Sequence, residues 1–91
     1  FEKYIVDIDG NGWPDGMCVD LEGNIWVAEW EGGRVRKWDV NTGEVLDEIT
    51  LPCSRITSCC LGGENLDELF ITTARSEKDI LGGALFRKKL K

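Results

Sequence analysis

Three short motifs occur twice in this chain of 91 residues, in the same order. The paired copies are residues 17–19 and 59–61, residues 25–28 and 69–72, and residues 32–35 and 82–85. The copies lie 42, 44 and 50 residues apart, which places the additional residues of the second copy in turns. A repeat of this length, built from short strands and variable turns, is typical of the four-stranded blades of a β-propeller. The repeat therefore predicts an all-β chain with about two four-stranded antiparallel blades.

The residue pattern indicates short strands rather than helices. Apolar and polar side chains alternate near the N-terminus, and Gly-containing turns separate the later segments. Strands are expected at residues 4–8, 17–20, 25–29, 34–40, 45–51, 58–61, 69–73 and 84–89. The one helix-like stretch, residues 64–69, is too short to form a stable helix.

These strands predict a partial β-propeller over residues 1–91. Residues 1–9 are expected to form a strand of a preceding blade, residues 13–51 one blade, and residues 57–89 most of the next blade. A propeller buries each blade against its neighbours in a closed ring, so two blades alone leave sheet faces and edges open. The chain is therefore expected to be an incomplete propeller, and its start at Phe1 rather than Met indicates a missing N-terminus.

Charge and hydropathy narrow the range of partners. The chain has 17 acidic and 11 basic residues, a net charge of −6, and only residues 87–91 concentrate basic side chains. This distribution is unlike the basic face of a nucleic-acid-binding domain, so residues 87–91 are expected to be a solvated strand end. No apolar run approaches the roughly 20 residues of a membrane-spanning helix. We therefore expect neither a nucleic acid nor a membrane as a partner.

The four cysteines, Cys18, Cys53, Cys59 and Cys60, form no Cys-x-x-Cys pair, and the chain has no histidine. A tetrahedral zinc site is therefore disfavoured. The thiols are expected to be free, to pack as small hydrophobic side chains, and to indicate a reducing, cytoplasmic environment. The absence of histidine also excludes a Ser or Cys nucleophile assisted by His within this chain.

The most informative segment for chemistry is Gly-Trp-Pro-Asp-Gly-Met at residues 12–17. Its aspartate, Asp15, is expected on a loop that opens on the mouth of the propeller channel. Pro14 fixes its own φ and Gly16 permits unusual backbone angles, so the carboxylate is held in a stiff frame. Such a carboxylate can bind a hard cation or accept a proton. An aspartate in a Pro-Asp-Gly turn also commonly bonds its own backbone, and the residues alone leave both interpretations open.

An overlapping pattern, Asp-x-Asp-x-Asn-Gly-x-x-Asp over residues 7–15, offers the oxygen ligands of a calcium-binding loop. Cys18 stands where an EF-hand requires a bidentate glutamate, and the flanking segments have strand patterns, so an EF-hand is disfavoured. A calcium loop between propeller strands and an ordinary hairpin turn are the two alternatives for this segment.

Three tryptophans, Trp26, Trp30 and Trp38, fall within expected strands. An exposed row of such rings could bind carbohydrate. Large aromatic side chains also fill the space between propeller blades, and this packing role is the one that we expect.

In its motifs and their order, the chain resembles the C-terminal third of the regucalcin, senescence marker protein and gluconolactonase family. The resemblance rests on residues 13–20, 22–28, 32–35, 51–52, 57–60 and 69–75, and so covers nearly the whole chain. It implies a six-bladed propeller that holds one divalent metal ion, Ca²⁺, Zn²⁺, Mn²⁺ or Mg²⁺, at the channel. Family members hydrolyse lactones of sugar acids, and some relatives act on other esters or in luciferin recycling.

The resemblance assigns one residue of this chain to the family's site. The aspartate of the family's Pro-Asp-Gly loop is a metal ligand and the implied general base, and its counterpart here is Asp15. The other metal ligands and the residues that contact the substrate are implied to lie upstream of Phe1, in N-terminal blades. The resemblance thus predicts a fragment of a metal-dependent lactonase that is inactive alone, with a small-molecule lactone as the substrate of the whole protein.

The alternative function is a non-catalytic calcium-binding propeller module. In that case Asp7 and Asp9 should lie with Asp15 around a shared ion. A lactonase instead requires Asp15 to face the channel with Asp7 and Asp9 turned away. A third possibility is a structural module in which Asp15 only caps its own turn.

Overall fold

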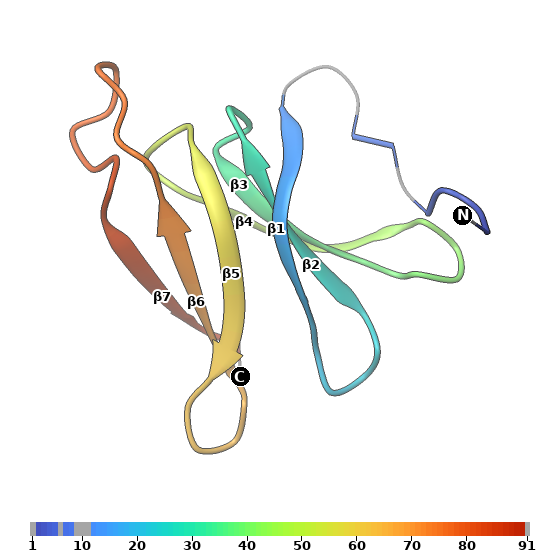
Figure 1. The fold of residues 1–91 in the computed structure, drawn as a ribbon. Helices are drawn as coiled ribbons and strands as arrows, with labels where there is room; N and C mark the ends of the chain where they lie inside the picture. The colour runs from blue at the N-terminus through green and yellow to red at the C-terminus, as the bar shows by residue number, and fades with distance from the viewer. Residues whose placement is uncertain (1, 6, 9–11, 91) are drawn as a thin grey trace.

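The computed structural model describes residues 2–5, 7–8 and 12–90, and this part of the chain is all-β (Figure 1). Two antiparallel sheets have the strand orders β1-β2-β3-β4 and β5-β6-β7, and no helix occurs among the described residues. The strands are β1 (Trp13–Val19), β2 (Ile25–Trp30), β3 (Arg34–Trp38), β4 (Val45–Thr50), β5 (Ile56–Gly62), β6 (Glu68–Thr73) and β7 (Leu85–Lys89). The predicted all-β fold is confirmed, and the second sheet contains the three strands expected over residues 57–89.

Each sheet is a meander because consecutive strands are antiparallel neighbours. Short turns join them, except between β6 and β7, where residues 74–84 form a longer loop. In the turn between β1 and β2, the Asp20 carboxylate accepts the backbone N–H groups of Glu22 and Asn24, each at 3.0 Å. Gly23 completes this turn with a φ of 86°, a backbone angle that side-chain-bearing residues rarely adopt. The Asp-x-x-Gly sequence thus sets the register in which β2 returns along β1.

Strand β3 is shorter than the sequence predicts, because a second turn of this kind begins earlier than expected. It ends at Trp38 rather than at residue 40. The Asp39 carboxylate accepts the backbone N–H groups of Asn41 and Thr42, at 2.8 and 3.2 Å. A carboxylate that bonds its own downstream backbone competes with the sheet ladder and closes the turn.

The strand predicted over residues 1–9 is absent from the described part of this segment. Residues 2–5, 7 and 8 lie outside any strand. A strand requires a neighbouring backbone to pair with, and none of the seven strands pairs with these residues. The segment contributes packing instead, because Ile8 lies against a small buried cluster of Ile25, Val27 and Trp38.

The main core lies between the two sheets, which pack face to face (Figure 1). Alternate side chains of a strand point to the same face, so every second residue of β2 and β6 reaches this interface. The buried core residues are Trp26, Ala28 and Val35 from the first sheet, Ile56, Cys59, Leu69 and Ile71 from the second, and Cys53 from the connection.

The tryptophans mostly have the packing role expected of them. Trp26 lies in the core between the sheets, and Trp38 is buried on the opposite face of the first sheet. Trp30 is half-buried, with the guanidinium of Arg55 5.0 Å from its ring centroid. The rings therefore form no row on one face that could serve as a platform for a sugar.

Two carboxylates join loops of the two sheets at one end of their interface. Glu31, in the turn after β2, accepts a hydrogen bond from Arg55 at 2.7 Å, which holds the pKa of this carboxyl below its usual value. Asp79, in the loop after β6, accepts the Ser54 hydroxyl at 2.6 Å and the Ser54 backbone N–H at 3.0 Å. These bonds lower the pKa of Asp79. Both carboxylates therefore favour the packed state when they are ionised.

We expect acid to weaken the fold through these two groups. A carboxyl whose pKa is lower in the folded state stabilises the fold above its unfolded pKa, and that contribution is lost as the pH falls through the folded pKa. The free energy of unfolding should therefore decrease below about pH 4. The double variant Glu31→Gln/Asp79→Asn should show a shallower decrease in urea unfolding followed by tryptophan fluorescence. The exposed Glu64→Gln serves as the control, and an acid slope equal to that of the wild type in the double variant would contradict the assignment.

Candidate functional site

Asp15 lies within strand β1, not on the loop that the sequence predicts. β1 begins at Trp13, four residues earlier than expected, and its pairing with β2 shifts between Pro14 and Met17. Pro14 lies opposite Glu29 and Met17 opposite Val27, so two residues of β1 face one residue of β2. This is a β-bulge, a device that re-aims a side chain and is frequent beside active sites. The Pro-Asp-Gly sequence is thus absorbed into the strand as a bulge.

The bulge is fixed by a close contact between β1 and β5, which lie side by side (Figure 1). A Cβ atom on Gly16 would lie 2.2 Å from the Ser58 hydroxyl oxygen and 2.8 Å from the Ser58 Cα atom. Only glycine leaves room for this approach. Pro14 adds a fixed φ on the other side of Asp15. The backbone around Asp15 is therefore held by the neighbouring sheet as well as by its own strand.

The Asp15 carboxylate is exposed and is not used to hold the local backbone. Asp20 and Asp39 show what a turn-capping aspartate does here, since each accepts two backbone N–H groups. Asp15 takes part in none of the hydrogen bonds or ion pairs found within the described ranges. The possibility that Asp15 only caps its own turn is therefore not supported by the geometry.

Among the described residues, no three Asp, Glu, Cys or His side chains converge as a metal-binding group. Asp7 is exposed, and Asp9 and Asn11 of the predicted calcium loop lie outside the described residues. The structure therefore does not test the shared ion of the calcium-loop alternative. Within the part of the chain that can be described, Asp15 lies on the first strand of its sheet, and no other carboxylate converges with it to form a metal-binding group.

The polar side chains of β5 beside the bulge were not predicted as neighbours of Asp15. Ser58 lies against Gly16, and the hydroxyl of the preceding Thr57 lies 2.7 Å from the hydroxyl of Thr72. Ser58 follows Gly16 by about one blade repeat in the sequence, so no local pattern joins them. The equivalence of the two motif copies was the available signal, because first strands of successive blades lie side by side.

The cysteines are free, as predicted, but only two of them are buried. Cys53 and Cys59 are buried, Cys18 is half-buried and Cys60 is exposed. The sulfur of Cys18 lies 3.8 Å from that of Cys59, and this contact lowers the pKa of Cys18. The same contact and burial raise the pKa of Cys59. Burial also raises the pKa of Cys53.

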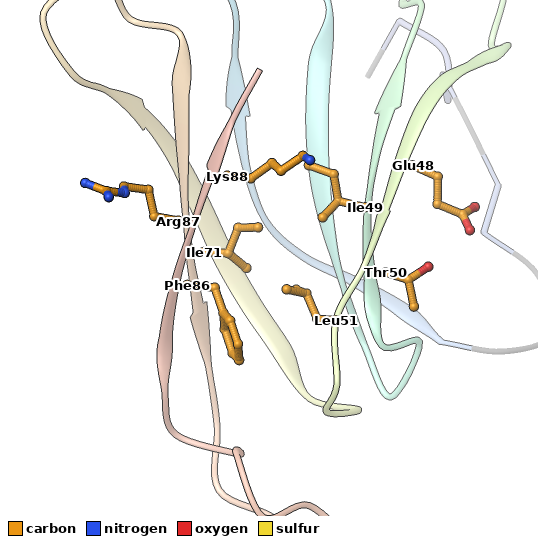
Figure 2. A pocket seen from close by; sticks show the side chains of 8 residues that line it. All are labelled: Glu48, Ile49, Thr50, Leu51, Ile71, Phe86, Arg87 and Lys88. Carbon is orange, nitrogen blue, oxygen red and sulfur yellow. The ribbon is translucent and has the colours of Figure 1, made fainter. Parts of the chain in front are cut away.

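A cavity of about 340 Å³ lies between β4 and the strands β6 and β7 (Figure 2). Side chains of Ile49, Leu51, Ile71 and Phe86 gather in it, while Arg87 points away. None of its lining residues comes from β1 or β5. This cavity therefore contains no part of the Asp15 site.

Two antiparallel meanders packed face to face, with their first strands adjacent and the ring unclosed, define a stretch of a β-propeller. A family model described as the SMP-30/Gluconolactonase/LRE-like region matches residues 2–75. The chain belongs to this family.

Relatives and solved structures agree with this assignment. A regucalcin of Danio rerio is 54% identical over 63 residues, which cover 69% of this chain and 21% of the relative. An uncharacterized protein of Sulfolobus acidocaldarius is 47% identical over 89 residues, which cover 97% of this chain and 32% of the relative.

Two solved structures share the fold. The crystal structure of a calcium-binding protein, regucalcin, from Agrobacterium tumefaciens has a TM-score of 0.81 at 28% identity, over 93% of this chain and 31% of that one. A luciferin-regenerating enzyme has a TM-score of 0.73 at 37% identity, over 84% of this chain and 27% of that one. The chain thus spans a third or less of the length of these proteins. Its described residues include no helix that could span a membrane.

Proposed function

We propose that this chain is part of a six-bladed, metal-dependent lactonase and that Asp15 is its contribution to the metal site. The observation that carries the proposal is the exposed Asp15 carboxylate, held in a β-bulge and left out of the local hydrogen bonds. Family membership supports hydrolysis of a small-molecule lactone as the reaction. The four free thiols support a cytoplasmic location.

A divalent ion fits the chemistry of this residue. A carboxylate oxygen is a hard ligand that suits Ca²⁺, Mg²⁺ and Mn²⁺ and that Zn²⁺ also accepts. The remaining ligands would come from sequence upstream of Phe1. When bound, the ion would polarise the lactone carbonyl.

Asp15 itself has two tasks in this proposal. Its carboxylate holds the ion, and a carboxylate oxygen accepts a proton from the water that opens the lactone ring to a hydroxy acid. The bulge supports both tasks, because the contact of Gly16 with Ser58 keeps the Asp15 backbone from shifting. A fixed backbone keeps a catalytic carboxylate in reach of its substrate.

The open faces of the two sheets fit further blades as partners. Met17 and Val19 are 51% and 60% exposed on the face of the first sheet that points away from the second. Leu85 is 67% exposed on the outward face of the second sheet. Apolar side chains at these places suit contact with a preceding and a following blade, as in a closed propeller.

Asp15→Asn tests the proposal in the complete protein encoded by the gene that contains this chain. We expect the metal-dependent hydrolysis of gluconolactone, measured with Ca²⁺ and with Zn²⁺, to fall at least about tenfold. Metal affinity measured by calorimetry should fall as well. Asp47→Asn is the matched control, since Asp47 is an exposed strand aspartate on β4. An unchanged rate and affinity in a folded Asp15→Asn protein would overturn the proposal.

A non-catalytic calcium-binding propeller is the second candidate. It is favoured by the aspartate spacing over residues 7–15 and by a structural relative described as a calcium-binding protein. Here Asp7→Asn should weaken calcium binding as much as Asp15→Asn does, with no lactone hydrolysis to lose. The lactonase proposal instead expects Asp7→Asn to leave the hydrolysis rate unchanged.

A further inference from the structure

Two thiols meet across the interface of the two sheets. The Sγ atoms of Cys18 in β1 and Cys59 in β5 lie 3.8 Å apart, although the residues are 41 positions apart in sequence. Both point into the interface, because Cys18 lies opposite the core residue Trp26 in the ladder and Cys59 belongs to the same core. The carbonyl oxygen of Trp26 lies 3.4 Å from the Cys59 sulfur and further restricts that thiol.

The spacing of the two sulfurs is suited to a bond between them. A disulfide requires a sulfur separation of about 2.05 Å and close approach of the two backbones. The contact between Gly16, two residues before Cys18, and Ser58, one residue before Cys59, shows that β1 and β5 do approach closely. Rotation about the two Cα–Cβ bonds is the movement that would bring the sulfurs together.

We propose that Cys18 and Cys59 form a reversible disulfide that joins the two sheets, by exchange with a low-molecular-weight disulfide such as oxidised glutathione. β1 and β5 belong to different sheets and share no ladder. This bond would therefore add a covalent link to the side-chain packing and the loop hydrogen bonds that hold the two sheets together. It would also tie the strand that carries Asp15 to its neighbour.

The exchange balances in two steps. The Cys18 thiolate attacks one sulfur of oxidised glutathione, the disulfide of the reagent breaks, and one glutathione leaves as a thiol. Cys59 then gives up its thiol proton and attacks the Cys18 sulfur of the mixed disulfide, and the second glutathione leaves and takes up a proton. The protein gives up two electrons and two thiol protons, and the reagent gains them. Excess reduced glutathione reverses both steps.

The surroundings of the two sulfurs explain why Cys18 reacts with glutathione first and Cys59 second. Cys18 is half-buried, so reagent can reach it, whereas Cys59 is buried. The contact with Cys59 lowers the pKa of Cys18, and this favours the thiolate that attacks first. Cys60 is exposed but lies on the opposite face of β5 from Cys59, so it can react with glutathione but cannot reach Cys18.

The test uses the full chain equilibrated with mixtures of reduced and oxidised glutathione, quenched with acid, alkylated and digested with trypsin. Trypsin places Cys18 in the peptide of residues 4–34 and Cys59 with Cys60 in the peptide of residues 56–75. A Cys60→Ser background makes the assignment of the second sulfur unambiguous. We expect mass spectrometry to find these two peptides cross-linked, and the peptide of residues 38–55, which holds Cys53, to remain alkylated.

The same titration in concentrated guanidinium chloride shows whether the folded structure favours the cross-link, because a denatured chain brings the two cysteines together only by random encounter. Folding that brings the sulfurs together should raise the equilibrium constant for the cross-link at least about tenfold over the denatured chain. The oxidised form should also unfold at a temperature higher by about 5 °C or more than the reduced form. Cys18→Ser and Cys59→Ser should each abolish the cross-link.

Two results would overturn the proposal. One is a glutathione adduct on Cys18 that never resolves into the cross-link at any redox ratio. The other is a cross-link that forms equally well in guanidinium chloride, which would show that the structure does not favour it. The comparison with denaturant uses the Cys60→Ser chain alone, so it decides the matter even if a Cys18 or Cys59 variant fails to fold.

Discussion

Gly16→Ala is expected to lower the free energy of unfolding by about 3 kcal/mol, the upper end of the cost of overpacking a filled core. The new methyl group would lie 2.2 Å from the Ser58 hydroxyl oxygen, 2.5 Å from its Cβ atom and 2.8 Å from its Cα atom. Rotation of the Ser58 side chain relieves only the first of these contacts. β1 must therefore move away from β5, which opens the interface that holds most of the core.

The cost at Gly16 is steric rather than conformational, and a second glycine provides the comparison. Gly16 does not have a positive φ, so alanine meets no backbone strain there. Gly23 has a φ of 86° and no atom within 4 Å of an added Cβ atom, so Gly23→Ala should show only the backbone cost of about 1 kcal/mol. Urea unfolding followed by tryptophan fluorescence measures both, because Trp26 lies in the affected core.

A second substitution, at Ser58, tests whether the cost of Gly16→Ala arises from its contact with Ser58. Ser58→Gly removes two of the three close contacts but leaves the Ser58 Cα atom at 2.8 Å. The double variant should therefore recover part, and not all, of the stability that Gly16→Ala loses. A Gly16→Ala protein within about 0.5 kcal/mol of the wild type would show that β1 and β5 do not touch in this way. The same displacement should also weaken the metal binding that we propose for the adjacent Asp15.

The fold could be predicted from the sequence because the repeat is long and its turns contain distinctive residues. Motif copies spaced by about one blade, with Gly-containing turns between them, were sufficient to predict seven of the strands. The prediction was wrong at a segment whose residues are compatible with either a turn or a β-bulge. Pro14 to Gly16 has the composition of a turn, yet β2 pairs on both sides of it and converts it into a bulge. The N-terminal segment has a strand pattern, but its described residues have no partner to pair with.

The candidate site could be predicted only in part. Asp15 was proposed as a site residue from its Pro-Asp-Gly motif. Its surroundings depend on β5, and β5 is expected beside β1 only once the two strands are recognised as the first strands of neighbouring blades. Cys18 and Cys59 were each expected to be free thiols, and the proximity of their sulfurs is a tertiary contact. The buried Glu29 was not predicted as special, although the turn at residues 31–33 implies a hairpin that places it opposite Arg34.

Glu29→Gln is expected to lower the free energy of unfolding by about 3 kcal/mol, because it removes the one negative charge shared by two partly buried arginines. Glu29 is fully buried in the first sheet, where Arg34 donates to one carboxylate oxygen at 2.8 Å and Arg36 to the other. Arg36 also lies over the ring of Trp38, 4.6 Å from its centroid. Without the carboxylate charge, both guanidinium groups keep most of their desolvation cost and lose the buried partner that they share.

Glu48→Gln is the matched control, since it removes the other carboxylate beside Arg34. Glu48 lies 3.6 Å from Arg34, but its side chain is 45% exposed, so its loss should cost less than about 1 kcal/mol and the cost should vanish at high salt. The cost of Glu29→Gln should persist at high salt, because a buried pair is poorly screened. Equal, salt-sensitive effects in the two variants would contradict a buried network. Glu29 also lies opposite Pro14 in the ladder, so the network supports the strand position from which the Asp15 bulge begins.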